Sequence, residues 1–202
     1  MVDHARERLA EQDQEPPAQI ILNGFSASGA FANRFCVLHP DRVCSVSAGG
    51  ISGIVTLPKE TSELGTEFGL SERLTPNYPV GVADIAELTA AQFDIESFRE
   101  IHQFYYIGEA DENDVLLWPD SWIDPELRAS AILSYGSNIL NDRFSFCASV
   151  HTDHDVPAIF RTYTQAGHKP SPAVDDIVTF HERTLANEKI GTIEDHLGGN
   201  PV

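Results

Sequence analysis

The chain has 202 residues, 42% apolar and 9% aromatic, which is enough for one domain of ordinary size with a hydrophobic core. Its 13 basic and 31 acidic residues give a formal net charge of −18 and a pI near 4.6. Such a surface repels nucleic acid and anionic membranes, so neither is an expected partner. The acidic residues are spread along the chain, which favours the acidic solvated shell of a halophilic protein over an ordinary acidic one.

The sequence contains no apolar stretch of membrane-spanning length, and its first residues lack the apolar core of a signal peptide. The three cysteines form no C-x-x-C pair. Cys36 and Cys44 have apolar neighbours, so we expect small core residues rather than metal ligands. These features predict a reducing, cytoplasmic location.

The first half of the chain alternates helix and strand patterns. A short charged helix is expected over residues 2–11, ended by a pair of prolines. The apolar run 19–23 predicts a buried parallel strand, and 27–38 has the apolar face of a helix. A second strand is predicted over 43–46. Residues 51–100 are richer in Gly, Pro, Thr and Ser, and we expect them to form an insertion or cap over the sheet.

The second half continues the alternation. The predicted strands are 103–107 and 158–163, and the predicted helices are 124–140 and 171–185. This order predicts an α/β fold: a parallel sheet of about four strands, flanked by helices on both faces. The domain would span residues 1–188, followed by a flexible, frayed tail over 189–202.

The segment Gly24–Gly29 lies between a predicted strand and a predicted helix, where a G-x-S-x-G turn places a nucleophile. Such a turn needs small residues two positions before and after the serine. Gly24 and Ser28 flank Ser26 in this way, with Ser in place of the usual second Gly. The turn would point Ser26 at the positive end of the helix and aim the Ala27 amide at a developing oxyanion. A phosphate-cradling loop and a plain structural turn remain alternatives.

An acid and a histidine follow two later strands. Asp111 comes after strand 103–107, and His168 after strand 158–163. Because the carboxyl ends of parallel strands meet at one crevice, we expect Ser26, Asp111 and His168 to converge. An imidazole would take the serine proton, and a carboxylate would fix the imidazole tautomer. Asp114, in the same acidic loop, is the alternative acid.

A second group of polar residues has metal-ligand chemistry: His151, Asp153, His154 and Asp155. It lies in a predicted polar loop with no second ligand set, so a solvated loop is the better interpretation. No metal and no cofactor are expected.

Four segments together resemble the α/β-hydrolase superfamily, and most closely serine esterases related to polyhydroxyalkanoate depolymerases, in the acidic versions of haloarchaea. These segments are Gly24–Gly29, Leu38–Val43, Ile107–Asp111 and Gly167-His168. The likeness extends over about residues 3–188. It implies Ser26 as nucleophile, Asp111 as acid, His168 as base, Ala27 as an oxyanion amide and a small-molecule ester as substrate. Phe25, beside the nucleophile, would line the substrate pocket or pack in the core.

In one respect this chain departs from the family that it resembles. In that family four strands precede the nucleophile strand, whereas about 18 residues precede it here. The chain would then be the C-terminal part of an α/β-hydrolase fold, without the early loop that supplies the second oxyanion donor. Its nucleophile strand would form an apolar sheet edge, which predicts self-association or pairing with a missing N-terminal piece.

Two functions follow from these observations. The first is a serine hydrolase that cleaves an ester-type bond through an acyl-enzyme. The alternative is a truncated, weak or inactive hydrolase remnant that acts as a binding or interaction module. A Rossmann-like phosphate-binding domain is a third interpretation, disfavoured because no G-x-G-x-x-G follows the first strand.

Overall fold

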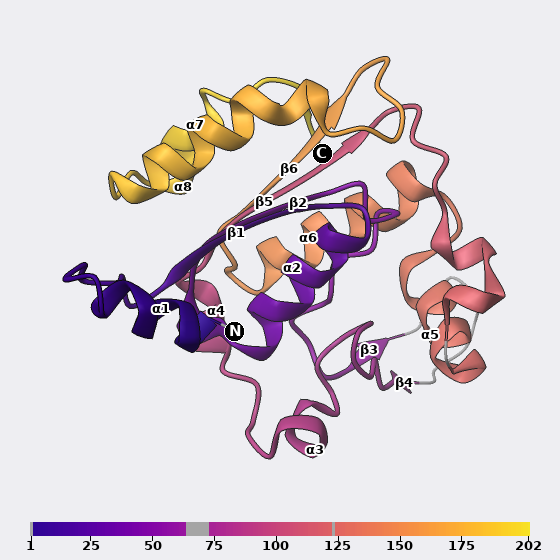
Figure 1. The fold of residues 1–202 in the computed structure, drawn as a ribbon. Coiled ribbons are helices and arrows are strands. Elements are labelled where there is room, and N and C mark those ends of the chain that lie inside the picture. The colour runs from indigo at the N-terminus through magenta and orange to yellow at the C-terminus, as the bar shows by residue number, and fades with distance from the viewer. Residues whose placement is uncertain (1, 64–72, 123) are drawn as a thin grey trace.

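A computed structural model of the chain describes residues 2–63, 73–122 and 124–202, which form an α/β fold (Figure 1). The main sheet of these residues has the order β1-β2-β5-β6-β7. Strands β1, β2, β5 and β6 run parallel, and β7 pairs antiparallel with β6. The strands are β1 (Ile20–Phe25), β2 (Val43–Gly49), β5 (His102–Gly108), β6 (Ala158–Tyr163) and β7 (Asn200–Pro201). The four predicted parallel strands are all present.

Helices cover both faces of the sheet, as the alternating pattern predicts (Figure 1). One face carries α2 (Ala27–Leu38) and α6 (Ser145–Asp153). The other carries α7 (Val174–Leu185) and α8 (Ile190–Glu194). The other α-helices of the described residues are α1 (Val2–Ala10), α3 (Ile85–Thr89), α4 (Ile95–Arg99) and α5 (Pro125–Tyr135), and a π-helical segment, η5 (Ile139–Phe144), precedes α6. None of the described helices combines the length and apolar character needed to cross a membrane.

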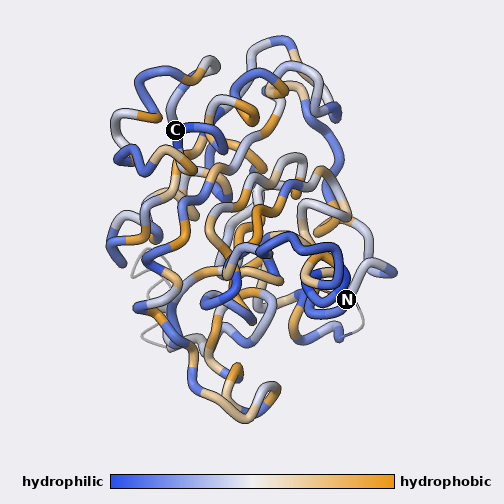
Figure 2. Tube along the Cα trace, turned by 60° about the vertical axis from the view of Figure 1, so that its left-hand side comes forward, coloured by the Kyte–Doolittle hydropathy of each residue, from blue (hydrophilic) through white to orange (hydrophobic). Residues whose placement is uncertain are grey.

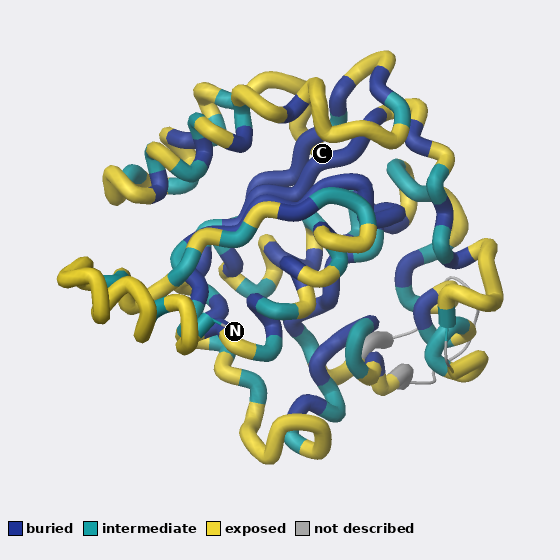
Figure 3. Tube along the Cα trace, viewed as in Figure 1, coloured by how far each residue is buried: buried dark blue, intermediate teal, exposed yellow. Residues whose placement is uncertain are grey.

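The core is divided between the two faces because side chains alternate along each strand. On β5, Tyr105 and Ile107 pack toward α5 and α6, whereas Phe104 and Tyr106 pack toward α7, where Phe180 meets them. Figure 2 shows hydrophobic residues gathered along the central strands and hydrophilic ones on the outer segments, and Figure 3 shows the central strands buried. The carboxyl ends of the central strands are therefore held by packing on both sides.

Strand β1 forms one edge of the described sheet, as the sequence predicts. Its residues alternate in burial, and Ile21 is 40% exposed. An unpaired edge exposes backbone donors and acceptors to other chains. Pairing of a second copy or another piece with this edge stays a prediction.

The segment expected to form an insertion contributes to the main core. Residues 64–72 of this segment lie outside the described residues. Around them, β3 (Ser62–Glu63) pairs antiparallel with β4 (Arg73–Leu74). Leu57 and Val80 are fully buried in the same cluster as β5. The described part of the segment thus packs as part of the domain.

Two element predictions were wrong in extent. The helix predicted over 124–140 ends at Tyr135, because Gly136 turns the chain at a positive φ of 83°. Residues 189–202, predicted as a flexible tail, instead contain α8 and β7, and Ile193 is fully buried against α7 and β6. The apolar residues Ile190, Ile193 and Leu197 pack there, but three such positions in a short segment rich in Gly and charged residues give little periodicity from which to predict that packing.

Candidate active site

The turn between β1 and α2 holds Ser26 in an unusual backbone conformation. Its φ is 57° and its ψ is −125°, outside the regions that non-glycine residues usually occupy. Gly24 is required beside it, because a Cβ there would lie 2.2 Å from the Ser28 carbonyl oxygen. A strained serine of this kind persists only where its surroundings hold it in place.

Ser28 explains how the turn accepts a serine in place of the usual second glycine. Its hydroxyl donates to the Phe25 carbonyl at 2.8 Å and accepts from the Phe25 amide at 3.0 Å. The side chain therefore folds back on the turn and stays away from Ser26. The start of α2 comes close to β2 at Gly29 instead, where a Cβ would lie 2.9 Å from the Gly49 carbonyl oxygen.

Ser26 also lies at the N-terminus of α2. Its amide donates to the Gly49 carbonyl at 2.8 Å, and its carbonyl accepts from the Ala30 amide at 2.9 Å. The Ala27 amide belongs to the first turn, where helix N–H groups have no intrahelical acceptor and carry a partial positive charge. It is thus a suitable donor to an oxyanion formed at Ser26.

The structure brings the three predicted side chains into one hydrogen-bonded chain. The Nε2 atom of His168 lies 3.0 Å from Ser26 Oγ. The Nδ1 atom of His168 lies 3.1 and 3.0 Å from the two carboxylate oxygens of Asp111. Because an ionised carboxylate only accepts hydrogen bonds, Nδ1 carries the proton and Nε2 is free to accept from the serine.

The Asp111 carboxylate is almost fully buried, with a side-chain exposure of 1%, while the His168 side chain is 30% exposed. The imidazole therefore lies between a buried carboxylate and the solvent-facing serine. This arrangement can accept a proton from Ser26 and stabilise the resulting imidazolium.

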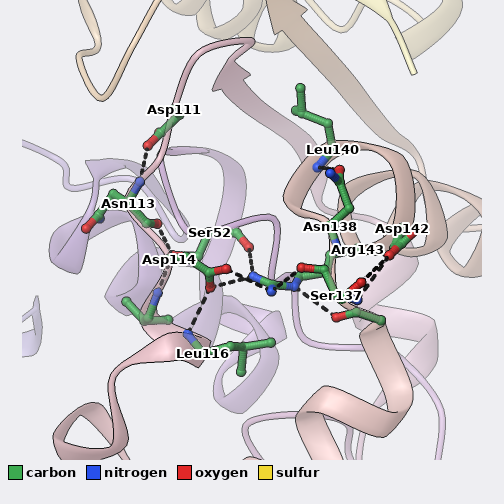
Figure 4. A network of polar contacts seen from close by, with 12 residues as sticks. Ser52, Asp111, Asn113, Asp114, Leu116, Ser137, Asn138, Leu140, Asp142 and Arg143 are labelled. Carbon is green, nitrogen blue, oxygen red and sulfur yellow. Dashed lines mark hydrogen bonds and ion pairs between the residues drawn. The ribbon is translucent and has the colours of Figure 1, made fainter.

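Asp114, the alternative acid, has a different partner. Its carboxylate pairs with Arg143, at 2.6 Å from Nη1 and 2.9 Å from Nη2 (Figure 4). Asp114 Oδ1 also accepts from the Leu116 amide at 3.0 Å. Asp111 is therefore the acid that contacts His168.

Asn113 is a site residue that the sequence analysis missed. Its amide donates to Asp111 Oδ1 at 3.0 Å, and its side-chain Nδ2 lies 3.3 Å from His168 Nε2. Asn113 thus contacts both the Asp111 carboxylate and the Nε2 atom of His168. Its position two residues after Asp111, where an Asx turn commonly forms, is the only sequence signal for it.

Phe25 was expected either to line the substrate pocket or to pack in the core. It does not line the cavity that holds Ser26. Its ring packs against the His168 ring, with centroids 4.7 Å apart, and against Tyr106 at 6.2 Å. The Phe25 ring therefore packs against the imidazole of His168 and is not positioned to contact a substrate in that cavity.

A cavity of about 340 Å³ opens beside Ser26 and His168. Its walls come from α2, from the loop after β2 and from the segment between Asn113 and Trp122. Half of its lining residues have apolar side chains: Ala27, Ala30, Ile51, Ile54, Pro79, Val115, Trp118 and Trp122. Both tryptophans of the chain are among them. A concave, mostly apolar space beside a few polar groups is typical of a small-molecule site.

The residues considered as metal ligands do not form a loop cluster. His151 and Asp153 lie in α6, and the His151 side chain is buried, with Nδ1 2.8 Å from the Cys147 carbonyl oxygen. Burial lowers the pKa of His151 to about 4. Within 2–63, 73–122 and 124–202, no three His, Cys, Asp or Glu side chains are grouped as metal ligands.

No family model matches the sequence, and no curated protein matches it. Solved structures do resemble the fold. Poly(aspartic acid) hydrolase-1 from Sphingomonas sp. KT-1 is 18% identical over 84% of this chain and 55% of that one, with a TM-score of 0.47. A ferulic acid esterase is 16% identical over 88% and 58%, with a TM-score of 0.48. A PHB depolymerase from Penicillium funiculosum is 12% identical over 76% and 40%, with a TM-score of 0.40.

The chain spans 55%, 58% and 40% of these three proteins, in each case less than two thirds of their length. At these identities and TM-scores, the activity of this chain has to be inferred from its own residues.

Proposed function

We propose that this protein is a serine hydrolase that cleaves an ester-type bond through an acyl-enzyme on Ser26. The observation that carries the proposal is the hydrogen-bonded chain from Ser26 Oγ through His168 to Asp111, with 3.0 Å between the hydroxyl and the imidazole. The positive φ of Ser26 supports it, because backbone strain of this kind concentrates at functional sites.

In the first half of the reaction, Ser26 Oγ attacks the ester carbonyl carbon while its proton passes to Nε2 of His168. The negative charge that develops on the carbonyl oxygen faces the Ala27 amide at the start of α2. The C–O bond to the alcohol then breaks, and His168 returns the proton to the leaving oxygen. Asp111 holds the imidazole in the required tautomer and stabilises its cation.

In the second half, water replaces the alcohol. His168 takes a proton from the water, the hydroxide attacks the acyl carbon, and the bond to Ser26 Oγ breaks as that oxygen regains a proton. The products are the acid and the free enzyme. No redox partner is needed for either half.

The alternative function is a binding module with little or no turnover. This alternative follows from the sequence-based expectation that the Ala27 amide, at the start of α2, acts without a second oxyanion donor. Loss of one donor of a pair lowers turnover by about 10²–10³-fold. Such a protein would still react with a covalent serine reagent.

A fluorophosphonate reagent tests the proposal, because it reacts with an activated serine hydroxyl and not with ordinary ones. We expect labelling of the wild type and loss of labelling in Ser26→Ala. Ser149→Ala, which removes an exposed serine of α6 that does not line the cavity, is the matched control and should label fully. Folded wild-type protein that resists the reagent, or a Ser26→Ala variant that still reacts, would contradict the proposal.

Turnover of para-nitrophenyl acetate separates the two functions. A hydrolase releases nitrophenolate continuously, whereas an inactive module that is only labelled releases no more than one equivalent.

A further inference from the structure

One wall of the cavity is a single face of α2, formed by Ala27, Ala30, Asn33 and Arg34. Residues 26 and 34 are separated by about 12 Å along the axis of a helix that rises 1.5 Å per residue. Arg34 is exposed and lines the cavity at the end of this helix face that lies away from Ser26. The two alanines between them are small and leave the helix surface open. A ligand can therefore lie along α2 from Ser26 to the Arg34 guanidinium.

The charge of this cavity is opposite to that of the whole protein. The chain has a formal net charge of −18, yet no Asp or Glu is among the described residues that line the cavity. Arg34 is the only Lys or Arg among them. It forms no ion pair with the other described residues.

A guanidinium with no protein carboxylate beside it suits an anionic ligand, because its planar fork binds a carboxylate by two parallel hydrogen bonds. The distant acidic surface opposes such a ligand weakly, since charges more than about 8 Å away are screened at physiological salt. The local contact with Arg34 therefore decides which charge the cavity prefers.

The two tryptophans of the lining suit a flat apolar group. The Trp122 indole donates to the Val115 carbonyl at 3.1 Å, which fixes its ring. Trp118 is 50% exposed although it lines the cavity. An indole that stays half exposed beside an apolar cavity gains contact area when an aromatic or similar group enters.

We propose that the substrate is an ester that carries both an apolar, planar body and a carboxylate. The carboxylate pairs with Arg34, the planar body lies against Trp118 and Trp122, and the ester carbonyl reaches Ser26. This inference rests on the proposed hydrolase function and names its substrate class. Arg34 is then a specificity-determining residue.

Binding can be tested without turnover, because both tryptophans of the chain line this cavity and report on it together. The probes are para-propylbenzoate, which is anionic at neutral pH, and para-propylbenzamide, which has the same shape and no charge. We expect the benzoate to change tryptophan fluorescence with a Kd about tenfold lower than that of the benzamide, as one charge-assisted pair allows. Arg34→Gln should remove this preference and leave benzamide binding unchanged.

Arg8→Gln is the matched control, because it removes the same charge from the exposed helix α1. It should keep the preference for the anion. Equal binding of the two probes by the wild type would overturn the inference, as would an anion preference that survives in Arg34→Gln.

Turnover is measured with the para-nitrophenyl esters of para-carboxyphenylpropanoic acid and of its carbamoyl analogue. We expect KM to be about tenfold lower for the charged ester and kcat to differ little, because Arg34 binds a part of the substrate that does not react. Arg34→Gln should raise KM for the charged ester alone.

The two readouts distinguish the two proposals. An Arg34-dependent anion preference in fluorescence without hydrolysis of either ester would overturn the hydrolase function and support the cavity's ligand class. Hydrolysis of both esters with equal kcat/KM, together with equal probe binding, would support the hydrolase function and overturn the substrate class.

Discussion

The carboxylate of Asp114 is held by both terminal nitrogens of the Arg143 guanidinium, and both residues are buried (Figure 4). Arg143 also donates to the Ser52 carbonyl at 3.3 Å and the Ser137 carbonyl at 2.7 Å. The Ser52 hydroxyl in turn donates to the Asn113 carbonyl at 2.6 Å. The ion pair therefore ties the loop after β5 to the loop after β2 and to η5. It fixes the segment that presents Asp111 to His168.

The first prediction concerns the stability that this ion pair provides. Asp114→Asn leaves the buried Arg143 charge without its partner, which typically costs 3–5 kcal/mol, so we expect a loss of about that size in the free energy of unfolding. Urea denaturation measures it. Asp120→Asn, at an exposed position in the neighbouring turn, is the control and should change stability by no more than about 0.5 kcal/mol. Equal stability of the two variants would show that the pair contributes little to the fold.

The second prediction concerns the other acid of the same loop. Asp111→Asn keeps the shape of the side chain but removes the charge that holds the proton on His168 Nδ1. We expect kcat for para-nitrophenyl acetate to fall by about 10⁴-fold, the effect of losing the correct tautomer. Circular dichroism should show the fold unchanged. A kcat within a few-fold of the wild type would remove Asp111 from the proposed mechanism.

The contrast between these two acids shows how far the sequence could predict this site. The order of strand ends placed Ser26, Asp111 and His168 at one edge of the sheet, because parallel strands share a direction. Sequence spacing could not separate Asp111 from Asp114, since both follow β5 within a few residues. The distinction depends on Arg143, which approaches from a π-helical segment that no periodicity predicts.

The fold likewise contains elements that the sequence predicts and elements that it does not. The four parallel strands were predictable because buried apolar runs between turn residues have few other solutions. Helix α6 was not predicted, since its mixture of small, polar and buried residues lacks a clear apolar stripe. Helix α8 was missed for a similar reason, as only two isoleucines in its five residues, Ile190 and Ile193, pack against the core.

The third prediction tests the turn that carries Ser26. Gly24→Ala would place a Cβ 2.2 Å from the Ser28 carbonyl oxygen, a backbone atom that cannot move without opening the turn. We expect a loss of at least about 2 kcal/mol in the free energy of unfolding and slower fluorophosphonate labelling. Gly191→Ala, where the added Cβ meets no atom within 4 Å, is the matched control. It lies in α8, so the same substitution should be neutral or stabilise by up to about 1 kcal/mol. Similar effects at the two positions would mean that the turn tolerates a side chain at residue 24.

The last prediction concerns acid sensitivity on the opposite face of the sheet. His181 on α7 lies between two serine hydroxyls of β2, 2.8 Å from Ser45 Oγ and 2.9 Å from Ser47 Oγ. Burial lowers its pKa from 6.5 to about 4. The unfolded chain therefore binds a proton between these values while the folded chain does not. The contribution of neutral His181 to the free energy of unfolding is fully present above pH 6.5 and is lost as the pH falls toward 4.

For a shift of this size, we expect this one histidine to lower the free energy of unfolding by roughly 2 kcal/mol between pH 7 and pH 5. His181→Gln cannot take up that proton, so its stability should fall less over the same interval. His4→Gln, at an exposed position on α1, is the control and should follow the wild type. Urea denaturation of the three proteins at both pH values provides the measurement. If His181→Gln lost as much stability as the wild type, the burial of His181 would not be a source of the acid sensitivity, and the carboxylates and His151 would have to account for it.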